Sequence, residues 1–410
     1  MTVAIYLDHA ATTPLLPEVI AAYTSALTLV GNPSSIHSQG QNAKRMLEEA
    51  RERVAASVGA DSVEVTFTSG GTEAINLAIK GLFWARAFAP ASARGPARAR
   101  ARASANPTTE RRRIISTRAE HHATIDTLEW LERHEGAIIE WIPVDPYGRI
   151  DLAALAAALA AADDVALITT LWANNEVGTV QPVADIVQLA SVRGVPVHAD
   201  AVSAFGQLPI DFHESGLAAL SISAHKVGGP VGIGALVIAR SASVTPLIHG
   251  GNQQRARSGT QNAAGAVAFG VAAGLISHDV AAMAQLRDQL ITAVRGAVPD
   301  AMLRGDPVDR VAGNAHFTFP GCEGDSLLFL LDVAGFSVST GSACQAGVPE
   351  ASHVLLAMGL DEADARGALR ITLGHGTTRA EVEAFVAALP NAVAKARSAG
   401  YADRVTTLGH

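Results

Sequence analysis

Residues 221–226 place a lysine where it could react with a carbonyl compound. The apolar run at residues 218–222 predicts a buried strand, and the polar residues Ser223, His225 and Lys226 follow it. Partial desolvation and nearby cations lower the pKa of an amine, and they leave part of it unprotonated and nucleophilic. A lone lysine after a strand is more often an ordinary surface residue, so this interpretation depends on the rest of the chain.

A glycine turn between a predicted strand and a predicted helix is a candidate phosphate site. Residues 63–68 alternate like a strand, and Gly70, Gly71 and Thr72 lead into a helix. Glycines let the backbone approach a ligand closely, and N–H groups at a helix start favour an anion. No Gly-Lys-Ser/Thr sequence follows, which excludes a Walker loop. Because any strand–helix unit can carry glycines, the turn alone is a weak signal.

Three more polar residues follow predicted strands, namely His121, Asn175 and Asp200. His121 and His122 together could suggest a metal site, but adjacent helical residues point about 100° apart and no HExxH motif is present. An imidazole at His121 that stacks on a planar ligand or moves protons is the preferred interpretation. Ordinary turn chemistry is the alternative for Asn175.

The chain has two cysteines, Cys322 and Cys344, which cannot form a disulfide framework. This count fits a reducing, cytoplasmic setting. Cys344 follows Gly341 and Ser342 in a segment rich in small residues, which is typical of an exposed, reactive thiol. Cys322 is the weaker candidate.

The predicted elements alternate between strand and helix from residue 63 onward. This alternation predicts an α/β fold with a mostly parallel sheet and helices on both faces, in which residues 232–239 add an antiparallel strand. Ligands of such sheets bind at the carboxyl ends of the strands. The chemically interesting residues share this placement: Thr72, His121, Asn175, Asp200 and Lys226.

The composition limits the other possibilities. The 410 residues include 49% hydrophobic and 17% charged residues, which predicts a compact, well-buried protein, and the net charge of −8 argues against a general nucleic-acid binder. The N-terminus lacks the features of a signal peptide, and the apolar stretch 263–276 is too short to span a membrane. Residues 89–113, rich in Arg and Ala, predict a solvated insertion; contact of its basic run with nucleic acid or an acidic partner is the less favoured interpretation.

The combination of these groups describes a pyridoxal-phosphate site. Lys226 would hold the cofactor as an imine, and Asp200 would pair with the protonated pyridine nitrogen, so that the ring stays an electron sink. The turn at Gly71 and Thr72 would hold the phosphate.

At this point the sequence resembles a known family, the cysteine desulfurases, which are class V members of the fold-type I pyridoxal-phosphate enzymes. The resemblance covers nearly the whole chain, and its motifs lie at residues 6–8, 11–14, 68–73, 120–121, 174–178, 198–201, 223–226, 257–260, 341–344 and 369–370. It implies a large domain at residues 15–260 with a mostly parallel sheet of the seven-stranded type and the insertion at 89–113. It also implies a smaller α+β domain, built from residues 1–14 and 261–410, that carries the cysteine loop.

The resemblance also implies a role for each site residue. Lys226 bonds to the cofactor and moves protons, His121 stacks on the ring as acid or base, and Asp200 binds the ring nitrogen. Arg370 clamps the substrate carboxylate, and Asn175 is also expected to bind the substrate. Cys344 attacks the sulfur of L-cysteine; alanine leaves, and a persulfide remains for an acceptor or iron–sulfur scaffold protein. Cys344 could also ligate an iron–sulfur cluster transiently. The remaining contacts to the cofactor are expected from Gly71, Thr72, Asn175, Ser203, Ser223, His225 and, across a homodimer interface, Thr260.

The sequence departs from the family at Ser203, where a Gln three residues after the ring-nitrogen Asp is usual. Serine is shorter, so it would reach the phenolic oxygen of the cofactor only through water. The resemblance favours sulfur delivery for iron–sulfur clusters or tRNA thiolation. The alternatives are a selenocysteine lyase or transaminase-like activity on the same fold, a non-catalytic scaffold, and a metal hydrolase using His121, His122 and His198.

Overall fold

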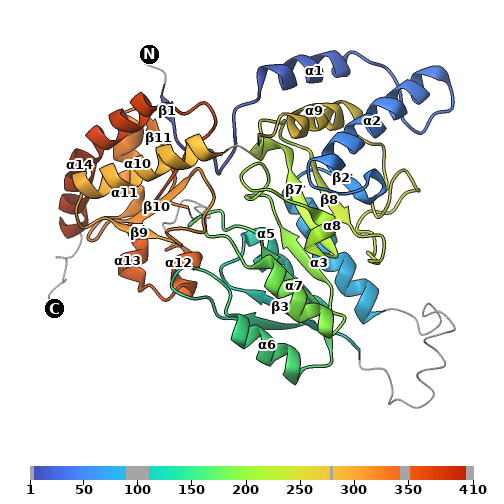
Figure 1. Ribbon diagram of the computed structural model, residues 1–410, viewed down its shortest axis with the longest axis horizontal. Helices are drawn as coiled ribbons and strands as arrows, with labels where there is room; N and C mark the ends of the chain where they lie inside the picture. The colour runs from blue at the N-terminus through green and yellow to red at the C-terminus, as the bar shows by residue number, and fades with distance from the viewer. Residues whose placement is uncertain (1–3, 89–109, 278–279, 342–350, 403–410) are drawn as a thin grey trace, which may run out of the picture.

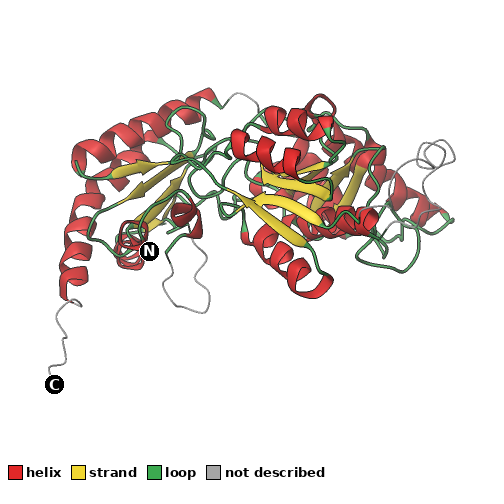
Figure 2. Cartoon of the chain, turned by 90° about the horizontal axis from the view of Figure 1, so that it is seen from below, coloured by secondary structure: helices red, strands yellow, loops and turns green. Residues whose placement is uncertain are grey.

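The computed structural model describes residues 4–88, 110–277, 280–341 and 351–402 (Figure 1). Cys344 and most of the expected insertion therefore lie outside the described residues. The described part of the chain forms two units, one with a single sheet and one with two small sheets, and each has its own apolar core (Figures 1 and 2).

A seven-stranded sheet with the order β2-β8-β7-β6-β5-β3-β4 organises the larger unit. All neighbouring strands are parallel except β8, which is antiparallel to both β2 and β7. This confirms the predicted mostly parallel sheet and its antiparallel strand. The strands are β2 (Val65–Thr68), β3 (Arg113–Thr117), β4 (Ile138–Ile142), β5 (Val165–Leu171), β6 (Val197–Asp200), β7 (Ala219–Ser223) and β8 (Gly234–Ile238).

The central strands are buried on both faces, which explains their continuous apolar composition. Along β8, for example, Leu236 and Ile238 pack into the core on one face, while Ala235 and Val237 pack into the core on the other. The first face is covered by α3 (Gly71–Ala87) and α5 (His122–Glu135). The second is covered by α2 (Ser38–Ala56), α6 (Leu152–Ala161), α7 (Val183–Val192) and α9 (Ala263–Gly274), with the short α8 (Phe212–Ser215) nearby and α1 (Pro17–Leu27) packed on α9.

The strand expected at residues 63–68 begins at Val65 in the structure, two residues after the expected start. Residues Ser62–Glu64 form a 3-10 turn, because the side chains of Asp61 and Glu64 form a reciprocal capping box with the backbone of this turn. Strand β2 begins only at Val65.

The smaller unit holds a three-stranded antiparallel sheet and a two-stranded parallel sheet. Their strands are β9 (Met302–Arg304), β10 (Asn314–Thr318) and β12 (Ala368–Thr372), and β1 (Ile5–Tyr6) and β11 (Phe336–Ser337). The helices of this unit are α10 (Ala281–Ala297), α11 (Gly324–Val333), α12 (His353–Ala357), α13 (Glu362–Arg366) and α14 (Arg379–Ala402). Among the described helices, none is both long enough and apolar enough to cross a bilayer.

The N-terminal residues 7–13 connect the two units, and we call this segment the N-terminal strap. On the side of the smaller unit, Thr372 N–H donates to Leu7 O at 2.7 Å, and Ala10 N–H donates to Thr372 Oγ1 at 2.9 Å. On the other side, Thr13 N–H donates to His225 O at 2.9 Å. The first strand of the chain therefore pairs with its last third, while the next few residues contact the turn that carries Lys226.

Candidate active site

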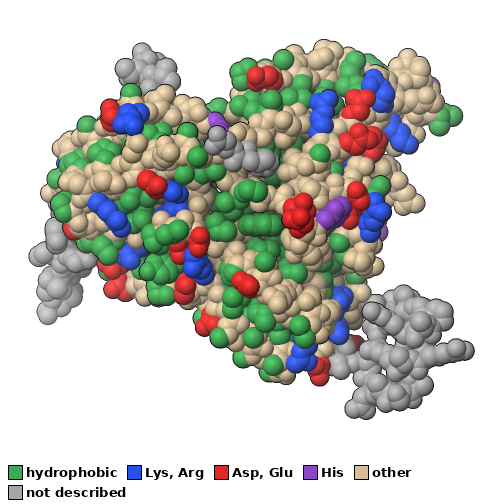
Figure 3. Space-filling view, in the orientation of Figure 1, with side chains coloured by type: hydrophobic (Ala, Val, Ile, Leu, Met, Phe, Trp, Pro, Cys, Tyr) green, Lys and Arg blue, Asp and Glu red, His purple; other side chains and the backbone are tan. Residues whose placement is uncertain are grey.

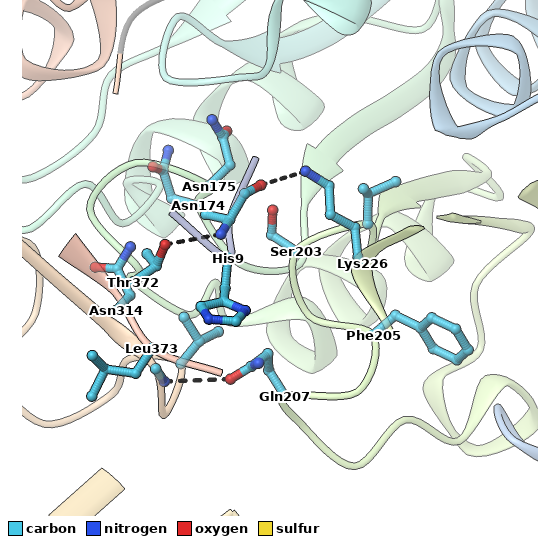
Figure 4. A pocket seen from close by; sticks show the side chains of 14 residues that line it. His9, Asn174, Asn175, Ser203, Phe205, Gln207, Lys226, Asn314, Thr372 and Leu373 are labelled. Atoms are coloured by element: carbon cyan, nitrogen blue, oxygen red, sulfur yellow. Dashed lines mark hydrogen bonds between the residues drawn. The ribbon is translucent and has the colours of Figure 1, made fainter. Parts of the chain in front are cut away.

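A cavity lies where the carboxyl ends of β5, β6 and β7 meet the N-terminal strap and the smaller unit (Figure 4). Figure 4 shows Lys226, Ser203 and Asn175 around this space, with His9 at its centre and Gln207 below. The residues lining it are His9, Ala10, Asn174, Asn175, Val202, Ser203, Phe205, Gln207, Lys226, Val311, Gly313, Asn314, Thr372 and Leu373.

Lys226 reaches the cavity from η3 (Ala224–Lys226), a 3-10 turn that directly follows β7. Its Nζ donates to the carbonyl oxygens of Ala10 and Ala11 in the strap, the second at 3.0 Å. Burial, and then the cation of Arg370, lower the pKa of this amine to about 8. A substantial neutral fraction near neutral pH is what a lysine that attacks a carbonyl carbon requires.

Asp200 ends β6, beside β7, and only 2% of the residue is exposed. Its Oδ1 accepts from Val202 N–H at 3.0 Å. Burial raises the pKa of this carboxyl to about 6, against the opposite effects of the Val202 N–H and the Lys226 cation. A buried carboxylate of this kind is stabilised by a cationic ligand group, as the protonated nitrogen of a pyridine ring would provide.

His121 caps the N-terminus of α5, because its Nδ1 accepts from Ala123 N–H at 3.0 Å. The neutral ring therefore carries its proton on Nε2. Desolvation, and then the Lys226 cation, lower its pKa to about 4, although the side chain keeps an exposed surface. His121 is thus neutral at pH 7 and has a proton to donate. Its neighbour His122 instead contacts the ring of His353.

The glycine turn lies close to the end of β7, as a phosphate site shared by both would require. A Cβ added to Gly71 would lie 2.8 Å from Val202 Cγ2 and 3.6 Å from Ser223 Cβ, so only glycine fits this approach. Thr72 is exposed in the first turn of α3. Ser223 Oγ is fully buried and has no hydrogen-bond partner among the described residues, so a ligand oxygen would satisfy it.

His225 is the least free of the residues expected to bind phosphate. Its Nδ1 lies 3.3 Å from Thr12 Oγ1 in the N-terminal strap. Burial, followed by the neighbouring Lys226 cation, lowers its pKa to about 4. The ring is therefore neutral at pH 7 and would act as a hydrogen-bonding group rather than as a cation.

Asn175 and Ser203 both line the cavity, as expected. Asn175 Oδ1 is buried and has no partner within the described part of the chain, which leaves it available to a ligand. Ser203 stands at the position where the resemblance leads one to expect glutamine, and its side chain is smaller. A glutamine from the same loop, Gln207, also lines this cavity. Gln207 Oε1 accepts from Gly313 N–H at 3.4 Å, and the sequence pattern did not single this residue out.

Arg370 extends from β12 of the smaller unit, and 5% of the residue is exposed. Its guanidinium donates to Asp8 Oδ1 and to Asn175 O, each at 2.9 Å. Its Nε is buried and unpartnered among the described residues. Asp8 holds the cation in place, and the unpartnered Nε–H is available for a carboxylate.

His9 and Asp8 are site residues that the sequence reasoning did not single out. Asp8 binds Arg370 across 362 residues of chain, and His9 contributes a buried Nδ1 without a partner in the described structure. Asp8 belongs to a motif that carried the resemblance, which was the available signal for it, whereas His9 only follows that motif in the sequence. Thr260 is exposed and does not line the cavity of this chain. Cys322 is buried in the core of the smaller unit, and burial raises its thiol pKa.

The comparisons with known proteins agree with this geometry. The model of the class-V aminotransferase family matches residues 5–91 and 97–385. An IscS-like cysteine desulfurase of Mycobacterium tuberculosis is 49% identical over 97% of this chain and 98% of its own length. The solved structure of a NifS-like protein covers 96% of this chain and 100% of its own, with 32% identity and a TM-score of 0.83. A second structure, SspA in complex with cysteine, has 32% identity and a TM-score of 0.75 over 90% of this chain and 98% of its own.

The chain belongs to the class-V aminotransferase family, whose NifS-like members are pyridoxal-phosphate enzymes of fold type I. Within this family it is a cysteine desulfurase. The described residues fit the cofactor. Lys226, an amine of lowered pKa, and Asn175, with its unpartnered Oδ1, line the cavity. The buried carboxylate of Asp200 and the unpartnered Ser223 Oγ end the neighbouring strands β6 and β7.

Proposed function

We propose that the enzyme transfers the sulfur of L-cysteine to the thiol of Cys344. The overall reaction is L-cysteine plus the Cys344 thiol giving L-alanine plus the Cys344 persulfide. One C–S bond breaks, one S–S bond forms, and the thiol proton is passed on to the alanine. When bound, pyridoxal phosphate supplies an electron sink for the substrate carbon next to the amine. The observation that carries this proposal is the convergence of Lys226, Asp200 and Arg370 on one site.

Separate residues of the chain would bind the substrate, hold the cofactor and transfer protons. Arg370 binds the substrate carboxylate and orients the amino acid, while Asp200 holds the positive charge of the ring nitrogen. Lys226, as a neutral amine, would hold the cofactor covalently, and it would take and return protons at the substrate carbons. His121, with its proton on Nε2, would lie against the ring and would serve as a second proton donor. Asn175 and Ser203 would lie toward the phenolic oxygen, and Gly71, Thr72, Ser223 and His225 toward the phosphate.

We also propose that the enzyme acts as a homodimer in which Thr260 reaches the phosphate site of the other subunit. Thr260 is exposed in the single chain. Three large apolar side chains in α1 and the following loop are also exposed: Leu27 by 62%, Val30 by 85% and Ile36 by 90%. Surface of this kind is typical of an interface. The sulfur acceptor would be an iron–sulfur scaffold protein or another acceptor protein that approaches Cys344 in a reducing, cytoplasmic setting.

The domain division is part of this proposal. The sequence placed the boundary at residue 261, but α9 packs in the core of the larger sheet, where the Phe269 ring lies 6.4 Å from that of Phe67. We therefore propose that the larger domain extends to about the end of α9 at Gly274. The smaller domain then comprises the N-terminal residues and the chain from α10 onward.

A single turnover with L-cysteine and no added reductant tests the sulfur transfer. We expect alanine and protein-bound persulfide in equal amounts, with the persulfide located on Cys344 by mass spectrometry. Cys322→Ser is the matched control and should leave both products unchanged. A Cys344→Ser variant that still loads an acceptor with sulfur would contradict the proposal.

A further inference from the structure

Glu176 is a buried carboxylate that no step of the proposed reaction uses. Only 1% of the residue is exposed. It lies in the turn at residues 174–178 that follows β5, directly after Asn175 of the cofactor site. Its position relative to the segment that carries Cys344 suggests what it does.

Both ends of that segment meet at the Glu176 side chain. On one side, a methyl group added to Gly341 would lie 3.0 Å from Glu176 Oε2, so the backbone of Gly341 passes directly beside the carboxylate. On the other side, Ser352 Oγ donates to the same Oε2 at 2.5 Å. Gly341 and Ser352 are described residues on either side of residues 342–350.

The Glu176 backbone is held in turn by both units of the molecule. Asn174 Oδ1 accepts from Glu176 N–H at 2.8 Å, and Asn174 Nδ2 donates to Ala119 O at 2.9 Å in the larger unit. Asn314 Nδ2, from β10 of the smaller unit, donates to Glu176 O at 2.8 Å. These hydrogen bonds fix the backbone of Glu176, and therefore the position from which its side chain extends.

The two ends of the segment are also tied to residues of the reaction itself. Before Gly341, Ser339 exchanges two backbone hydrogen bonds with Arg370, of 2.6 and 3.2 Å. After Ser352, the Nε2 of His353 lies 2.8 Å from the carbonyl oxygen of Glu120, the residue before His121. Glu176 thus joins the two ends at a point between the carboxylate clamp and the ring-stacking histidine.

We propose that Glu176 is a positioning residue that holds the two ends of the Cys344 segment together and so sets where the thiol can reach. This inference rests on the proposed role of Cys344. Because attack on sulfur needs close alignment of the reacting atoms, displacing the ends by about 1 Å is expected to cost up to about 100-fold in rate. Steps that do not involve the thiol should be unaffected.

The test compares Glu176→Ala, Glu176→Gln and the control Glu64→Ala in the holoenzyme. Glu64 is also buried and hydrogen-bonded, but to Asp61 and His213 at the opposite end of β2 from the glycine turn. Two rates are measured with L-cysteine and a third with the alkylating reagent iodoacetamide. They are the change in cofactor absorbance on cysteine binding, the formation of alanine in one turnover, and the alkylation of Cys344, resolved from buried Cys322 by mass spectrometry.

For Glu176→Ala we expect an absorbance change within about twofold of wild type, alanine formation slowed by about 10- to 100-fold, and faster alkylation of Cys344. Glu176→Gln keeps an acceptor oxygen for Ser352 and should lose less than about fivefold. The control should match wild type in all three rates. Equal losses in absorbance and alanine formation, an unchanged rate of alanine formation, or the same pattern in Glu64→Ala would overturn the proposal.

A second pair of variants keeps the test decisive if Glu176→Ala does not fold. Ser352→Ala removes the hydroxyl that donates to Glu176, whereas Ser352→Thr retains one. We expect about tenfold slower alanine formation in the first and near wild-type rates in the second. Equal rates in both would contradict the proposal. Failure of the wild-type enzyme to form alanine from cysteine would instead disprove the proposed function itself.

Discussion

The two sides of the active site are built in different ways. On the side of the larger unit, Asp200 ends one strand and Lys226 follows the neighbouring parallel strand, and burial shifts the pKa of each group so that its neutral form is favoured. On the side of the smaller unit, Arg370 is buried but directly neutralised by Asp8 of the N-terminal strap. The first side creates reactivity by desolvation, and the second provides a fixed cation for substrate recognition.

The two sides also interact through charge and through hydrogen bonds. The Arg370 cation contributes to the lowered pKa of Lys226, and the strap that carries Asp8 provides the carbonyl groups that Lys226 contacts. On the molecular surface shown in Figure 3, acidic and basic side chains are interspersed over both units. The electrostatic difference between the two sides is therefore confined to the buried active site.

The largest effect on activity is expected from removing Arg370, the cation on the side of the smaller unit. Arg370→Ala removes the charge-assisted hydrogen bonds to the substrate carboxylate, and it should lower kcat/KM by about 10²- to 10³-fold, mainly through KM. Steady-state alanine formation at varied L-cysteine measures this. Arg304→Lys, at a cation of the same small sheet that donates to Thr318 rather than to Asp8 and Asn175, is the control and should change kcat/KM less than about threefold. An unchanged KM in Arg370→Ala would show that the carboxylate is bound elsewhere.

A smaller effect is expected on the desolvated side, in the stability of the cofactor-free protein. Because the folded pKa of Asp200 is raised from 3.8 to about 6, the folded state binds more protons than the unfolded state between these values. The wild type should therefore lose up to about 3 kcal/mol of stability relative to Asp200→Asn as pH rises from about 3 to about 7, and no more above that.

Urea unfolding of the two cofactor-free proteins across this pH range measures the difference. A wild type that gains stability relative to Asp200→Asn as pH rises would show that the carboxyl is stabilised in its ionised form.

The smallest effect concerns the electrostatic link between the two sides. Since the pKa of Lys226 is lowered to about 8, the rate at which the cofactor-free enzyme captures pyridoxal phosphate should rise about tenfold per pH unit below 8 and level off above it. In Arg370→Met the loss of the cation should move this midpoint to higher pH. The approach to the imine absorbance after mixing measures the rate, and a midpoint that moves to lower pH would contradict the link.

The larger unit was predictable from local patterns. Buried strands followed by polar residues were visible in the sequence, and the sheet places His121, Asn175, Asp200 and Lys226 toward one edge. The start of β2 was wrong by two residues because the capping box of Asp61 and Glu64 outcompeted the alternating pattern. Gln207 was missed because it has no local signature and becomes a site residue only through the loop that follows β6.

The sequence by itself determined which residues end the parallel strands, because parallel strands all point in one direction and their carboxyl ends must share an edge. It also predicted which residues serve as the reactive amine, the carboxylate and the thiol. Only the tertiary structure decided that Asp8 neutralises Arg370 and that Glu176 lies between Gly341 and Ser352. These contacts join segments far apart in the chain, and no local periodicity encodes them; they arise from the packing of the smaller unit against the edge of the larger sheet.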